Sequence, residues 1–384
     1  MTIRAKEKML ARLMNRQNEL PVPLTPRLCK LVARGLSASE IEFLVALGTA
    51  PHTKEEARAK SGMPAGEFEP FFRNLAKKGY VYRPRVENGV EIFELMPIVV
   101  GWLEMQLCHG RETEKEKEFA RELEGFFRSL SITNTFPARP IENFIVKRFL
   151  KPFQTIASPR PLESGRIEVN RDVHYTATRV ETTSSACELI ERHAANNSVA
   201  LMHCFCRQWR RLLGDKCRFA IRPETCLVIG DFARYIVDYD YGRAVSKKEA
   251  LDVLEETGKA GAVHTLYHER DDVALDYIAV CNCCWDCCGL YGGHNRGLLP
   301  LYFRSGFEAR VTDPASCKGC GKCVKHCPVN AVSLVEKKAV IKTPICIGCG
   351  QCAAKCPTNS ISLAANPRDV MVPMPKKSEA RIRI

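Results

Sequence analysis

The stretches CKGCGKCVKHCP at residues 317–328 and CIGCGQCAAKCP at residues 346–357 decide the fold of the C-terminal part of this 384-residue chain. Both have the spacing C-x2-C-x2-C-x3-C-P, so the unit is duplicated. A glycine stands on each side of the second cysteine in both copies. Glycine allows positive φ angles and a close approach of backbone N–H groups to sulfur. The pattern therefore predicts two tight loops that each wrap three corners of an iron–sulfur cubane.

The fourth cysteine of each motif stands before a proline at the start of a predicted helix, out of reach of its own cubane. In such a duplication the fourth cysteine binds the other cluster. We therefore expect two [4Fe–4S] clusters. Zinc is the alternative, but zinc sites do not need this triple spacing followed by Cys-Pro. The expected ligands are Cys317, Cys320, Cys323 and Cys356 for one cluster and Cys346, Cys349, Cys352 and Cys327 for the other.

Residues 308–365 resemble the bacterial two-cluster ferredoxins on the strength of these motifs. The resemblance implies a duplicated ββα fold and two clusters close enough for fast electron exchange. It also implies low reduction potentials, on the order of −400 mV or lower.

A second concentration of cysteines lies in the middle of the chain. Five of them fall within CNCCWDCC at 281–288, at the end of a predicted strand, which is too dense for ordinary core packing. The sequence predicts at least one further iron–sulfur cluster there, with a second cubane or a larger non-cubane cluster as possibilities. Zinc is the alternative, and a redox disulfide ranks below both. The nine candidate ligands, of which a subset is needed, are Cys204, Cys206, Cys217, Cys226, Cys281, Cys283, Cys284, Cys287 and Cys288.

Charged neighbours of these cysteines have two interpretations. Arg207, Arg210 and Arg211 follow the first pair and either neutralise cluster charge or form a solvated basic face. The histidines are either ligands and proton donors or structural residues. They are His203, His264, His268 and His294.

The whole chain resembles a group of anaerobe-type 4Fe–4S dicluster proteins with a helical N-terminal region and CxCR and CNCC segments. The segments that carry the resemblance are Cys204–Arg207, Cys226, Ser246–Ala250, Ala262–His264, Cys281–Cys284 and the two ferredoxin motifs. The group is defined by its clusters, so the resemblance implies no substrate. The insertion of Trp285 and Asp286 leaves open which thiols of the run are ligands.

The remaining sequence predicts a multidomain α+β protein. Residues 36–108 combine three amphipathic helices with two strands around Asn88-Gly89, a winged-helix pattern. The expected parts are a basic helical arm (1–35), a winged-helix-like domain (36–108), a helix with a Pro-rich linker (109–165), a cysteine-rich α+β domain (166–307), the ferredoxin-like domain (308–365) and a basic, extended tail (366–384).

Composition restricts the compartment. The chain has 20 cysteines and a formal charge of +13, which overstates its basicity because cluster-bound cysteines are thiolates. No secretory signal and no transmembrane stretch are visible. We therefore expect a reducing, oxygen-protected cytoplasm, with metal-bound thiols instead of disulfides.

Electron transfer is the leading functional hypothesis. The chain lacks a GxGxxG after a strand, a P-loop, a Ser-His-Asp order and a CxxxCxxC loop. It is therefore expected to be an electron-transfer component of an oxidoreductase complex, in contact with redox proteins. A complex at the membrane surface stays possible.

Two other functions are open. An enzyme would bind substrate at an open iron of the middle cluster, with His203, His264 and Tyr267 as candidate proton donors. A redox-sensing regulator would bind DNA through the winged-helix-like region. Nucleic acid is not the expected partner, because Glu67 and Glu69 lead the proposed recognition helix and would repel phosphates.

Overall fold

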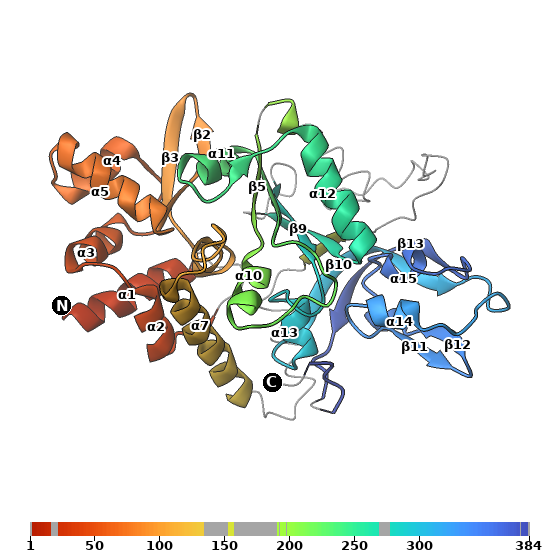
Figure 1. The fold of residues 1–384 in the computed structure, drawn as a ribbon. Coiled ribbons are helices and arrows are strands. Elements are labelled where there is room, and N and C mark those ends of the chain that lie inside the picture. Colours follow the sequence, from red (N-terminus) through yellow and green to blue (C-terminus); the bar gives the residue numbers. More distant parts are fainter. Residues whose placement is uncertain are drawn as a thin grey trace.

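The structure is a computed structural model that describes residues 2–16, 22–133, 153–156, 190–191, 193–196, 198–268, 277–376 and 378–382. Helices and strands are mixed along these residues, which confirms the α+β fold class. The N-terminal helices, a large sheet and a small unit with the duplicated motifs follow one another across the molecule (Figure 1).

The N-terminal part is a helical unit with a small antiparallel sheet of order β1-β3-β2. Two of its helices begin at capping boxes, in which Ser37 pairs with Glu40 and Thr53 with Glu56. The order of these elements is that of the expected three helices and hairpin, and the winged-helix assignment itself stays a prediction. The elements are α1 (Ile3–Arg16), α2 (Pro26–Val32), α3 (Ala38–Leu47), β1 (His52–Thr53), α4 (Lys54–Ser61), α5 (Ala65–Lys77), β2 (Val81–Glu87), β3 (Val90–Leu95), α6 (Leu103–Met105) and α7 (Glu114–Thr133).

This helical unit packs against the middle of the chain through one shared apolar core. Two buried tyrosines connect them: the hydroxyls of Tyr235 and Tyr241 donate to the carbonyl oxygen of Ala76 at 3.0 and 2.8 Å. Lys77 at the end of α5 pairs with Asp240 at 2.6 Å. The N-terminal unit is therefore fixed to the middle domain by buried contacts as well as by surface charges.

An eight-stranded sheet forms the centre, with the order β13-β10-β4-β8-β9-β6-β5-β7. All neighbours are antiparallel except β10 and β4. Helix α12 begins at the N-cap Ser246 and covers one face through Val253 and Leu254. The elements of this region are β4 (Phe153–Ile156), β5 (Val199–His203), α10 (Phe205–Leu212), β6 (Glu224–Ile229), α11 (Asp231–Asp238), β7 (Arg243–Ala244), α12 (Lys247–Ala260), β8 (Val263–His268), β9 (Tyr277–Cys283), α13 (Tyr291–Asn295) and β10 (Leu301–Val311).

The unit with the duplicated motifs is inserted between two neighbouring strands of this sheet, β10 and β13. It contains the hairpin β11-β12 and two short helices that each begin after a glycine with positive φ. In Figure 1 it lies at the opposite end of the molecule from α3–α5. Its elements are α14 (Lys322–His326), β11 (Val332–Val335), β12 (Lys338–Ile341), a short 3-10 helix (Thr343–Ile345), α15 (Gln351–Ala354) and β13 (Ile361–Val372).

Two expectations about connecting segments differ from the structure. The linker expected at 109–165 lies partly outside the described residues, but its residues 153–156 form β4 and pair with β8 and β10. The tail expected from residue 366 is strand β13 as far as Val372. The strand continues past residue 366 because Val370 pairs with Phe303 of β10 and its side chain is buried. Residues 153–156 and 366–372 are therefore parts of the central sheet.

Candidate iron–sulfur sites

The first four-cysteine set surrounds a cavity between the duplicated unit and β10. We call it the inner cavity. All four thiols that line it are buried, and two accept backbone N–H groups: Ala309 donates to Cys346 Sγ at 3.4 Å and Ala331 to Cys327 Sγ at 3.2 Å. The cysteines are Cys327, Cys346, Cys349 and Cys352.

The second set surrounds a cavity nearer the surface, which we call the outer cavity. Cys320 is exposed there, and Cys317 and Cys356 are half-buried. The cysteines that line it are Cys317, Cys320, Cys323 and Cys356. Each cavity thus brings together three cysteines of one motif and the fourth of the other, the crossed arrangement expected from the sequence.

Glycines hold the two loops against the rest of the protein. Gly348 has φ +66°, and a Cβ there would lie 2.2 Å from the carbonyl oxygen of Phe307 in β10. Gly319 has φ +63°, and a Cβ there would lie 2.3 Å from the carbonyl oxygen of Lys337. No L-residue with a Cβ fits at either position without movement of the backbone.

The residues present fit a [4Fe–4S] cluster in each cavity. Four thiols converge on each space; the other residues that line the inner cavity are apolar, and the outer cavity is also lined by Lys318, Thr358 and Ser360. Burial, together with neighbouring thiols, raises the pKa of Cys349 and Cys352. These thiols are therefore protonated when free, and binding of a cluster must release their protons.

The nine middle cysteines fall into two sets of thiol contacts. The larger, which we call the six-thiol set, lies around the end of β9 and the start of α10. Cys283 contacts Cys281 and Cys288, and Cys206 is linked to Cys288 and also accepts the backbone N–H of Gly289 at 3.1 Å. Its members are Cys204, Cys206, Cys226, Cys281, Cys283 and Cys288.

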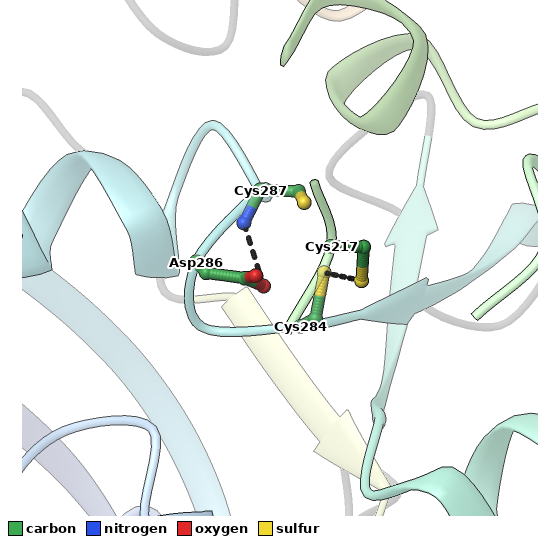
Figure 2. Close-up of side chains that lie close together, drawn as sticks. All are labelled: Cys217, Cys284, Asp286 and Cys287. Atoms are coloured by element: carbon green, nitrogen blue, oxygen red, sulfur yellow. Dashed lines mark hydrogen bonds between the residues drawn. The ribbon is translucent and has the colours of Figure 1, made fainter. Parts of the chain in front are cut away.

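The smaller set consists of Cys217, Cys284 and Cys287, together with Asp286. One ligand atom from each lies within 4.8 Å of every other. Figure 2 shows how Cys217 comes from one loop while the other three residues share the turn after β9. Asp286 was not among the expected ligands, although its place inside the cysteine run could have indicated it.

Arg207 is the arginine that faces the middle thiols. It is only 3% exposed and donates to Thr225 Oγ1 at 2.6 Å and to Cys284 Sγ at 3.8 Å. Burial lowers the pKa of its guanidinium, but three thiols outweigh burial and raise it; these are Cys204, Cys284 and Cys217. The other two arginines lie in ion pairs with carboxylates: Arg210 with Glu124 and Asp215, and Arg211 with Glu112.

Three of the expected histidines, His203, His264 and His294, have neighbours other than the thiols. His264 is 1% exposed and bonds through Nδ1 to Asn282 Oδ1 at 2.6 Å, and His294 bonds through Nδ1 to the carbonyl oxygen of Leu299 at 3.2 Å. The ring of His203 lies against Gly110. The side chains of Tyr267 and His268 lie outside the described residues.

Tyr291 lies in the apolar core that contains both Cys283 of the middle thiols and cysteines of the inner cavity, and no sequence motif indicated it. Its side chain is fully buried and stacks on Phe303 of β10 with ring centroids 5.5 Å apart. Burial, and then the charges of Cys283 and Cys349 from the two sites, raise the pKa of its phenol. Tyr291 therefore belongs to the same apolar core as cysteines of both sites.

Comparison with known proteins gives one match. The family model of the 4Fe-4S dicluster domain matches residues 309–357. No curated protein and no solved structure matches the chain. The chain is therefore an iron–sulfur protein whose 4Fe-4S dicluster domain supports a role in electron transfer. The middle cysteines lie outside the matched residues.

A helix that crosses a membrane needs about 20 mostly apolar residues. Along the part of the chain that the structure describes, none is both long and apolar enough to cross a membrane.

Proposed function

We propose that this chain is an electron-transfer subunit or adaptor that passes low-potential electrons singly between a ferredoxin-type donor and a partner oxidoreductase. One observation carries the proposal: a single buried apolar core contains cysteines of both cavities together with Cys283 and Cys288 of the six-thiol set. Bound [4Fe–4S] clusters supply one-electron chemistry at low potential. A continuous dry core excludes water from the path between the sites.

The six-thiol set is the proposed site of a third cluster. It offers more thiols than one cubane needs, and Gly289 donates a backbone N–H to one of them. Hydrogen bonds to cluster sulfurs and the exclusion of water both tune the potential of such a centre. Tyr291 shares the buried apolar core with Cys283 and Cys349, so the core that contains this centre and the inner cavity includes a packed aromatic side chain.

We place the entry of electrons at the outer cavity. Cys320 is exposed there, and Val335 at the tip of the β11-β12 hairpin is 55% exposed. Lys318 lines the same cavity, and Lys322 and Lys337 are exposed near it. An apolar patch with a basic rim suits an acidic redox protein, because opposite charges steer the encounter and short contacts favour electron transfer.

The described residues give less support to the two other functions. His264, a candidate proton donor for an enzyme, is already bonded in a buried position to Asn282. The basic residues of the proposed recognition helix are used within the chain: Arg73 donates to the carbonyl oxygen of Asp238 at 3.0 Å, and Lys77 pairs with Asp240. These contacts favour a docking role for the winged-helix-like region.

The test is the iron and acid-labile sulfide content per chain, purified without oxygen, with EPR of the reduced protein. We expect about twelve irons, because three cubanes carry four each. Cys283→Ala should lower this to about eight and remove one EPR signal. Cys29→Ala, a buried cysteine in α2 outside all these sets, is the control and should keep every signal. About eight irons in the unaltered protein would refute the third centre.

A further inference from the structure

We propose that Cys217, Cys284, Cys287 and Asp286 form a separate mononuclear metal site that binds Zn²⁺. This site is additional to the three clusters and does not depend on them. It divides the cysteine-rich run between two kinds of metal centre.

The distances between ligand atoms suit a single ion. Cys217 Sγ and Cys284 Sγ are 3.8 Å apart, and all four ligand atoms lie within 4.8 Å of one another. A tetrahedral zinc site with Zn–S bonds of about 2.3 Å requires sulfurs about 3.8 Å apart.

The local fold separates these thiols from the six-thiol set. Cys284 and Cys287 belong to a small apolar cluster with Ile221 and Ala262, whereas Cys283 and Cys288 belong to the core that reaches the inner cavity. Residues adjacent in sequence therefore have their side chains in different environments. The turn after β9 can hold two sites because Cys284 and Cys287 lie in one apolar cluster and Cys283 and Cys288 lie in the other.

Asp286 is fixed in place for such a site. Its Oδ2 accepts the backbone N–H of Arg218 at 2.6 Å, and its Oδ1 accepts the backbone N–H of Cys287 at 2.9 Å. A carboxylate has about four lone-pair positions, so these two bonds leave an oxygen able to bind a metal ion. The bond from Arg218 joins the loop of Cys217 to the turn of Cys284 and Cys287.

The buried charge of Arg207 is a second, independent observation. Within the described part of the chain its polar partners are two carbonyl oxygens, Thr225 Oγ1 and Cys284 Sγ, with no carboxylate among them. A buried cation needs a compensating anion. A divalent ion bound by three thiolates and a carboxylate is net negative, and it supplies that compensation next to Arg207.

The site offers four protein ligands, as structural zinc sites do; three of its residues are buried, and Cys217 is half-buried. It would fasten the loop that carries Arg218 and Phe219. Arg218 lies over the ring of Trp285 at 5.5 Å, and Phe219 contacts both Trp285 and His326 of the duplicated unit. The metal would therefore hold the contact surface between the middle domain and the cluster-bearing unit.

The experiment is zinc analysis and zinc K-edge absorption of the full-length protein, purified without oxygen in the presence of a chelator. We expect about one zinc per chain, with three sulfurs at about 2.3 Å and one oxygen at about 2.0–2.2 Å. Cys217→Ala should lose the zinc and keep all its iron, and the control Cys29→Ala should keep both.

The unaltered protein decides the question even if a variant does not fold. Absence of zinc, or a zinc shell of four sulfurs, would overturn the assignment. Loss of about four irons with Cys217→Ala would instead make Cys217 a cluster ligand. Iron content and EPR of the same samples test the third cluster separately, so the two proposals can fail independently.

Discussion

Replacement of Gly348 by alanine should lower the free energy of unfolding of the loop that lines the inner cavity, and the structure gives the magnitude. The positive φ of +66° costs an L-residue about 1–2 kcal/mol. The added methyl group would also lie 2.2 Å from the carbonyl oxygen of Phe307 and 2.4 Å from Ser305 Oγ. Ser305 is buried and donates to the carbonyl oxygens of Phe307 and Ile347, so it cannot move away freely. Overpacking of this kind costs about 1–3 kcal/mol more.

Gly62 provides a matched control for this substitution. It also has φ +66°, at the end of α4, but a Cβ there would meet nothing within 4 Å. Gly62→Ala should therefore cost only the conformational part, about 1–2 kcal/mol. Both variants would be compared by thermal unfolding and by the iron retained during incubation with a chelator. Equal stability of the two variants, with equal retention of iron, would refute the argument that the Gly348 loop is held against β10.

Two further predictions concern pH and partner binding. Burial lowers the pKa of His294 from its ordinary value of 6.5 to about 4, so the stability it contributes is present above pH 6.5 and is lost as the pH falls through 4. The stability lost amounts to at most about 3 kcal/mol. The free energy of unfolding of His294→Asn, measured with a denaturant between pH 7 and 5, should depend less steeply on pH than that of the unaltered protein. An identical pH dependence of the two proteins would contradict the prediction. Lys318→Glu at the outer cavity should slow reduction by an acidic two-cluster ferredoxin several-fold at low salt, with little effect at high salt. Stopped-flow kinetics would measure this, with Lys248→Glu on α12 as a control that should leave the rate unchanged.

The cluster-bearing unit could be predicted in detail because its information is local. The spacing of three cysteines, the flanking glycines and the terminal Cys-Pro are all contained in twelve residues, and duplication supplies the partner. Cys327 lines one cavity with the cysteines of the second motif, and Cys356 lines the other with those of the first; that they bind clusters in this crossed way stays a prediction. The middle site could not be predicted in this way, because its cysteines come from four separate segments whose approach depends on the pairing of β5, β6, β8 and β9.

The sequence by itself determined that this is a multidomain α+β protein with a 4Fe-4S dicluster unit and an unusual excess of middle cysteines. Only the tertiary structure decided that Cys283 and Cys284, neighbours in the chain, belong to different sets of thiols. Side chains alternate along an extended strand, so adjacent residues face opposite sides. What lies on each side is set by elements distant in sequence: Cys206 of α10 on one side, and the loop of Cys217 on the other. Only the fold, likewise, buried Arg207 beside these thiols while Arg210 and Arg211 reached carboxylates.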